Sequence, residues 1–202
     1  MRSFKIFLGG FNSTGKTALL NALVSVHSRV TVCHGSKEFM SWLGLKQDDY
    51  ESLEHLPEDY KDRELSKMIQ CLISEVDKNS NCDIWIFAGH FGRIKESEAI
   101  LAVGDWMLNF NLITLLTADP QILIKRTMND FFSGTRKRDR LMELINSSSN
   151  QLEVFARLVK QTEQISEQLS SRYGIPLLKL NSSEFNPSQL ATQLLYHVRL
   201  SN

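Results

Sequence analysis

The sequence has little cysteine and no long hydrophobic run, and each of these absences excludes a class of protein. Its 202 residues hold three cysteines and no C-x-x-C pair, which argues against a disulfide framework and a zinc site: Cys33, Cys71 and Cys82. The five histidines form no metal-binding pair at helical spacing. No apolar stretch approaches the ~20 residues of a membrane span, and the N-terminal apolar run is too short for a signal peptide. These absences predict a reduced, cytoplasmic protein with no membrane partner.

An excess of charge of either sign is also absent. The chain has 23 basic and 23 acidic residues, so its formal net charge is zero. A protein that coats nucleic acid or an anionic membrane needs a large positive excess, so we expect neither as its main partner. The hydrophobic fraction of 42% is enough for the core of one α/β domain with insertions.

What the sequence does contain is a phosphate-binding motif near its start. An apolar run over residues 4–8 leads into a stretch that fits G-x-x-x-x-G-K-[ST], the P-loop: Gly10, Phe11, Asn12, Ser13, Thr14, Gly15, Lys16 and Thr17. A helix-forming stretch begins with Ala18. A buried strand, a glycine loop and a helix are the context that this motif requires.

The residue types of the motif match the chemistry of a triphosphate. Backbone N–H groups of residues 10–18 can wrap the phosphates only if side chains do not block the approach, so Gly10 and Gly15 are small. The N-terminus of the following helix adds partial positive charge. Lys16 would contact the outer phosphates, and the Thr17 hydroxyl would bind Mg²⁺. The motif therefore predicts ATP and Mg²⁺ as cofactors.

The rest of the chain alternates between apolar runs and amphipathic stretches. We expect strands over residues 4–8, 29–34, 83–88, 111–117 and 175–180, with helices between them that include 96–108 and a long one over 139–172. Such alternation implies a parallel sheet covered on both faces. The predicted fold is an α/β, three-layer P-loop NTPase sandwich with a five-stranded parallel sheet. It forms a single domain, 1–202, with a helical insertion at about 35–80 and a short arginine-rich lid at about 127–140.

The kind of P-loop protein follows from what accompanies the motif. No guanine-binding N-K-x-D clamp follows a middle strand, and no Asp-Glu pair ends the strand over 83–88. Arginines instead flank a small-residue loop: Arg126, Arg136 and Arg138. Phosphoryl transfer needs such cations, because the planar arginine fork neutralises the moving phosphoryl group. A solvated basic turn is the plain alternative, and a nucleic-acid patch with Phe131 and Phe132 for base stacking is another.

These motifs, in their order and spacing, resemble the archaeal-type adenylate kinases within the nucleoside monophosphate kinase fold. The resemblance covers most of the chain and includes the P-loop, His34-Gly35-Ser36, Leu56-Pro57-Glu58, Gly89-His90, Ala118-Asp119-Pro120, Arg126 and residues 135–139. It implies an ATP-dependent kinase with a small acceptor: a nucleotide, a nucleoside or another metabolite. It also implies that Lys16 binds the β- and γ-phosphates, that Arg126 stacks on adenine or touches phosphate, and that Arg136 and Arg138 close as a lid.

Two positions depart from that family's pattern. Ala88 stands where the family places an aspartate that holds the Mg²⁺ shell, which leaves Thr17, or a carboxylate such as Asp83 or Asp119, for the metal. Glu54 stands near the family's arginine for an acceptor monophosphate, and an acidic group there would repel a phosphate. The acceptor is therefore expected to be neutral or cationic.

We expect the acceptor site to draw on residues that follow the second and third strands, together with the segment before residue 56: Gly35, Ser36, Glu54 and His90. His90 or a nearby carboxylate would orient or deprotonate an acceptor hydroxyl. The alternative function, favoured by Ala88, is a P-loop ATPase that acts as a nucleotide-dependent switch or as a nucleic-acid- or ribonucleoprotein-associated factor.

Overall fold

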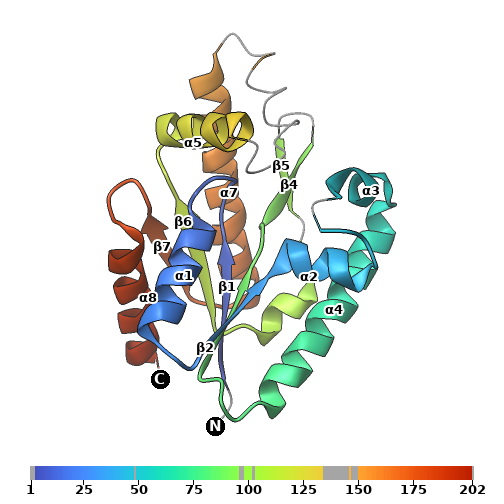
Figure 1. Ribbon diagram of the computed structural model, residues 1–202, viewed down its shortest axis with the longest axis vertical. Helices are drawn as coiled ribbons and strands as arrows, with labels where there is room; N and C mark the ends of the chain where they lie inside the picture. The colour runs from blue at the N-terminus through green and yellow to red at the C-terminus, as the bar shows by residue number, and fades with distance from the viewer. Residues whose placement is uncertain are drawn as a thin grey trace.

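Five parallel strands form the central sheet of the computed structural model, which describes residues 3–47, 49–95, 98–101, 103–133, 146 and 150–201 (Figure 1). The strands are β1 (Phe4–Gly9), β2 (Val30–His34), β3 (Ile84–Ala88), β6 (Leu112–Thr117) and β7 (Leu177–Asn181). Their order across the sheet is β2-β3-β1-β6-β7, and every pairing is parallel. The motif-bearing strand β1 is therefore central, and its neighbours β3 and β6 come from distant parts of the chain.

Helices cover both faces of this sheet. On one face lie α1 (Lys16–Val26) and α8 (Pro187–Ser201), which pack against each other, and on the other lie α4 (Glu58–Lys78), the 3₁₀ turn η1 (Asp105–Asn109) and α7 (Gln151–Tyr173). Three further helices complete the described chain: α2 (Gly35–Trp42), α3 (Tyr50–His55) and α5 (Pro120–Phe132). The predicted α/β sandwich with a five-stranded parallel sheet is confirmed.

Side chains along β1 alternate between the two faces of the sheet, so this strand contributes to two hydrophobic cores. Phe7 faces α4 and α7, whereas Ile6 and Leu8 face α1 and α8, and all three are at most 1% exposed. The Phe7 side holds a cluster of aromatic rings with neighbouring centroids 5.3–6.4 Å apart: Phe7, Trp85, Phe87, Phe91, Trp106 and Phe110. Each buried large apolar side chain contributes about 1.5–3 kcal/mol, so these rings fix β1 and β3 firmly beneath the phosphate-binding motif.

The prediction of a helix over residues 96–108 is wrong. The chain instead forms an antiparallel hairpin of β4 (Gly92–Lys95) and β5 (Glu98–Leu101), followed by η1. Within that range β5 has the sequence Glu-Ala-Ile-Leu, which is only four residues long and rich in helix formers, so no local pattern distinguishes it from part of a helix. Cross-strand pairing, which no local pattern encodes, decides the outcome.

The structure also corrects the predicted boundaries of other helices. The long helix expected over 139–172 is α7, which begins at Gln151, where the Asn150 side chain accepts a hydrogen bond from the Glu153 N–H. Of residues 139–149 only 146 is described. Asp119 precedes α5 as expected for an N-cap, but its side chain makes no capping hydrogen bond. Of the expected lid, residues 127–133 lie in and just after α5, and 134–140 lie outside the described residues.

In the part of the chain that the structure describes, no helix is both long and apolar enough to cross a membrane. The three cysteines are all free, with Cys33 and Cys82 buried and Cys71 exposed on α4. Burial, with a smaller contribution from the negative charge of Glu38, raises the pKa of the Cys33 thiol to about 12. Because the thiolate is the reactive form, a raised pKa makes Cys33 inert at neutral pH.

We predict that a thiol reagent such as dithionitrobenzoate labels one cysteine rapidly in the folded protein at pH 8. Cys71 is exposed, whereas Cys33 stays protonated and Cys82 is buried with its thiol directed to the Ile84 carbonyl at 3.4 Å. Unfolding in urea should release all three thiols, and a Cys71→Ser variant should lose the fast phase. Rapid labelling of Cys33 in the folded protein would contradict the burial described here.

Candidate functional site

The loop of the Gly10–Thr17 motif joins the carboxyl end of β1 to the N-terminus of α1, at the edge of the sheet to which all five strands point (Figure 1). Gly10 has φ +150°, and a Cβ there would lie 2.2 Å from the Leu116 carbonyl oxygen on the neighbouring strand. Gly15 has φ +92° and immediately precedes α1. Both glycines are required by their torsions, and Gly10 also by the close approach of β6.

Lys16 extends back over the loop that precedes it. Its Nζ donates to the carbonyls of Gly10 and Phe11, at 2.9 Å each, and the Thr14 hydroxyl donates to the same Phe11 carbonyl at 2.9 Å. Phe11 itself is 5% exposed and packs edge-on against Phe155 of α7, which anchors the loop to the core. The ammonium therefore lies within the loop, beside the first turn of α1, whose N–H groups have no partners inside the helix.

Ser13 is the one described non-glycine residue with a positive φ, +59°, and two consecutive residues of α5 hold it. Arg126 Nη1 donates to the Ser13 carbonyl at 3.3 Å, and the fully buried Thr127 donates its hydroxyl to Ser13 Oγ at 3.2 Å. A left-handed conformation costs a non-glycine residue roughly 1 kcal/mol. The α5 contacts thus offset strain in the middle of the loop.

Arg126 also ties the loop to the last strand. Its guanidinium donates to Ser182 Oγ at 3.0 Å and to the Ser182 carbonyl at 3.1 Å, just beyond β7, while Ser183 Oγ accepts from the Asp119 N–H at 2.7 Å. The sequence prediction missed Ser182 and Ser183, although the rule that ligands bind at the carboxyl ends of parallel strands applies to β7 as to the others. Arg126 itself was predicted and lies at the loop.

The end of β3 meets the loop from the other side. His90 Nδ1 lies 3.0 Å from the Gly10 carbonyl, which only accepts, so Nδ1 carries the proton and the lone pair of a neutral ring is on Nε2. Phe91 is fully buried against Gly9, where an added Cβ would lie 2.2 Å from its ring. The segment after β3 therefore contacts Gly9, the last residue of β1, and Gly10, the first residue of the motif.

The remaining predicted acceptor residues are placed differently. A Cβ at Gly35 would lie 2.7 Å from the Phe87 ring and 2.8 Å from the Ala88 carbonyl, so this glycine lets α2 begin against β3. Ser36 is exposed in the first turn of α2. Glu54 is exposed on α3, which Figure 1 shows well apart from the loop between β1 and α1. Arg136 and Arg138 lie outside the described residues.

The residues that could hold Mg²⁺ are few. Thr17 lies in the first turn of α1, and Ala88 at the end of β3 supplies no carboxylate. Asp83 precedes β3 at its opposite end, where it pairs with Arg29 at 2.8 Å, so it is not at the loop. Among the described residues no three carboxylates, histidines or cysteines cluster as a metal site. The donor set fits a magnesium ion held by Thr17, nucleotide phosphates and water, as is common for this ion.

Solved structures with the same fold exist, at low sequence identity. The shikimate kinase from Acinetobacter baumannii in complex with shikimate is 13% identical with a TM-score of 0.60, and the match covers 99% of this chain and 95% of that one. The shikimate kinase from Bacteroides thetaiotaomicron is 13% identical with a TM-score of 0.60, covering 97% and 98%. That from Aquifex aeolicus is 15% identical with a TM-score of 0.54, covering 97% and 96%.

No family model matches the chain, and no curated protein matches it by sequence. The structural likeness is therefore one of fold: this chain has the P-loop kinase fold of shikimate kinases. The archaeal-type adenylate kinase resemblance is supported only at the coarser level of the P-loop nucleoside monophosphate kinase fold, to which the matched structures belong.

We predict an energetic coupling between Thr127 and Ser13. Thr127→Val keeps the shape of the side chain but removes the hydroxyl donor, and should lower the free energy of unfolding by about 1 kcal/mol. In a Ser13→Gly background the acceptor and the left-handed strain are both gone, so the same substitution should cost less. Urea unfolding of the four proteins gives a coupling energy of about 0.5–1.5 kcal/mol.

The matched control is Thr162→Val on α7, another buried threonine whose hydroxyl donates, at 2.8 Å, to the Leu158 carbonyl of its own helix. Its cost should be the same in the wild-type protein and in the Ser13→Gly variant. Additive costs for Thr127→Val and Ser13→Gly would show that α5 does not support the loop.

Proposed function

We propose that this protein is an ATP-dependent kinase that transfers the γ-phosphate of ATP to a small-molecule acceptor. The observation that carries the proposal is the position of the Lys16 ammonium, 2.9 Å from the Gly10 and Phe11 carbonyls and within a loop of left-handed glycines that opens onto a helix N-terminus. Backbone N–H groups, a helix dipole and a cation then converge on one small space. That combination suits a polyphosphate.

Arg126 would act at the same nucleotide. Its hydrogen bonds to Ser13 and Ser182 hold the guanidinium between the phosphate loop and the β7–α8 connection. From there it would contact the phosphates or stack on the base. Mg²⁺ would be held by Thr17 and would neutralise phosphate charge when bound. Arg136 and Arg138, in the predicted lid, would complete the set of cations around the phosphoryl group.

The acceptor is proposed to be a small molecule with a hydroxyl group rather than AMP. The matched solved structures are named as kinases of a small molecule, shikimate, which supports an acceptor of that size. The negative charge of Glu54 on α3, which the resemblance to adenylate kinases places on the acceptor side, argues against a monophosphate. Gly35 and Ser36 at the end of β2 and His90 at the end of β3 border the acceptor side. His90, whose Nδ1 donates to the Gly10 carbonyl, would act on the acceptor side as the residue that orients the acceptor hydroxyl.

A nucleotide-dependent switch with slow ATP hydrolysis is the second candidate, and Ala88 favours it. Where β3 ends without a carboxylate, the metal has one fewer protein group to bind it or to orient its water ligands. Such a protein would bind ATP through the same loop but would show no acceptor-dependent turnover. The fold and the proposed nucleotide site are common to both candidates, so a test of acceptor-dependent turnover decides between them.

We predict that Lys16→Ala weakens binding of ATP·Mg²⁺ about 10- to 100-fold, because charged hydrogen bonds of about 1.5–3 kcal/mol are lost. Isothermal titration calorimetry measures the change. Lys160→Ala, an exposed lysine on α7, is the matched control and should bind ATP normally. Equal affinity of the wild type and Lys16→Ala would refute the phosphate-loop assignment.

Incubation with ATP·Mg²⁺ and a panel of acceptors tests the transfer itself. The panel contains nucleoside monophosphates, nucleosides, sugars, hydroxy acids and amino alcohols, and ADP release is measured against an acceptor-free sample. We expect ADP release to rise with a hydroxyl compound that carries no phosphate, and mass spectrometry should find that compound one phosphate heavier. ATP hydrolysis that no acceptor accelerates would favour the switch, and preference for AMP would contradict the acceptor class.

A further inference from the structure

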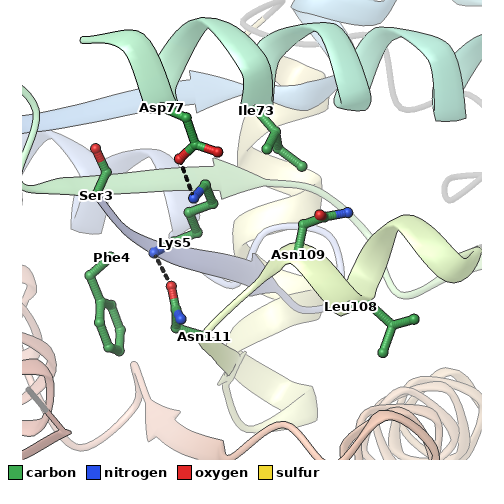
Figure 2. A pocket seen from close by; sticks show the side chains of 8 residues that line it. All are labelled: Ser3, Phe4, Lys5, Ile73, Asp77, Leu108, Asn109 and Asn111. Atoms are coloured by element: carbon green, nitrogen blue, oxygen red, sulfur yellow. Dashed lines mark hydrogen bonds and ion pairs between the residues drawn. The ribbon is translucent and has the colours of Figure 1, made fainter. Parts of the chain in front are cut away.

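A polar cavity lies at the amino-terminal end of the sheet, opposite the loop of the Gly10–Thr17 motif. Its volume is about 340 Å³, at the small end of the range for ligand pockets. It is bordered by β1, the last turns of α4, and the η1–β6 connection, with the following lining residues: Ser3, Phe4, Lys5, Ile73, Asp77, Leu108, Asn109 and Asn111. Figure 2 shows Lys5 between Asp77 and Asn111, with Asn109 and Leu108 on η1 to one side.

Lys5 is an unusual residue for its position. It lies on the central parallel strand, where apolar residues are the rule, and it is 6% exposed. Its Nζ lies 2.6 Å from Asp77 Oδ1. The Asp77 side chain is 35% exposed, so this ion pair is only partly buried and contributes at most about 1 kcal/mol to stability. Packing alone therefore gives no reason for a lysine here.

Asp77 is equally ill suited to a purely structural role. It occupies the last turn of α4, one residue before the helix ends at Lys78, where the helix dipole disfavours a negative charge. Its second carboxylate oxygen makes no hydrogen bond or ion pair to any described residue. One oxygen thus holds Lys5, and the other remains available as an acceptor.

The two asparagines add a donor and an acceptor to the cavity. Asn111 Oδ1 accepts from the Lys5 N–H at 2.8 Å, and its Nδ2 donates to no described residue. Asn109 Nδ2 donates to the Trp106 carbonyl at 3.0 Å, and its Oδ1 accepts from no described residue. Lys5 uses one of three ammonium protons. The cavity therefore offers donors at Lys5 and Asn111, and acceptors at Asp77 and Asn109, beside the apolar side chains of Ile73 and Leu108.

We propose that this cavity binds a small zwitterion of the α-amino acid class with an apolar side chain. The ligand carboxylate would pair with Lys5 and Asn111, its ammonium with Asp77 and Asn109, and its side chain would lie against Ile73 and Leu108. A ligand of either single charge would leave one half of the constellation unmatched. The site is independent of the proposed kinase activity: Lys5 and Gly10 are five residue steps apart along β1 and its end, about 17 Å at 3.3 Å per residue.

The test uses ¹⁵N-labelled full-length protein and L-leucine as the probe. Two-dimensional NMR should show saturable shifts of the Leu108, Asn109 and Asn111 amides at millimolar leucine. Leucine without its ammonium (4-methylpentanoate) and leucine without its carboxylate (3-methylbutylamine) should each bind at least tenfold more weakly. Absence of saturable shifts at these amides, or equal shifts with all three probes, would overturn the proposal without bearing on ATP binding.

Substitutions locate the effect. Lys5→Met keeps the volume of the side chain but removes its charge, and Asp77→Asn removes the acceptor charge, so each should weaken leucine binding at least tenfold. Asp83→Asn is the matched control, since Asp83 pairs with Arg29 and does not line the cavity. The dispersion of each variant's own amide spectrum reports whether it is folded. Leucine binding that persists in both folded cavity variants would also overturn the proposal. If either variant fails to fold, the amide shifts of the wild-type protein with the three probes decide the test.

Discussion

The carbonyl oxygen of Gly10 is the point on which the candidate site depends. It accepts hydrogen bonds from Lys16, in the first turn of α1, and from His90, at the end of β3, while the Gly10 α-carbon lies against the Leu116 carbonyl of β6. Three strands and a helix therefore meet at one residue that has no side chain. Any side chain there would displace β6, and the loop of the Gly10–Thr17 motif would lose its shape.

A second group of contacts completes the loop from the opposite direction. Arg126 and Thr127 hold strained Ser13 from α5, and Arg126 continues to Ser182 beyond β7. The loop is thus connected to the ends of β3, β6 and β7 and to two helices, and contacts within the protein alone fix its geometry. Phosphoryl transfer involves little covalent chemistry by the protein. It requires mainly N–H groups and cations that are already in position around the phosphates.

Much of this arrangement could be predicted from the sequence. The features that could not be predicted depend on contacts between separate segments of the chain. The motif from Gly10 to Thr17 is local, and apolar strand runs are strong signals, so the sheet and the loop were predictable. The β4–β5 hairpin depends on pairing between short segments, which local periodicity does not encode. The contacts of Thr127 and Ser182 to the loop join residues far apart in sequence, so only the folded chain brings them together. The acceptor roles of Glu54 and His90 stay predictions.

The most direct measurement of the central claim compares the affinities of ATP·Mg²⁺ and adenosine for the wild-type protein by calorimetry. If the Gly10–Thr17 loop is a phosphate cradle, most of the binding free energy comes from the triphosphate, and ATP·Mg²⁺ should bind at least about a hundredfold more tightly than adenosine. Equal affinity for the two ligands, or no binding of ATP·Mg²⁺, would contradict the account.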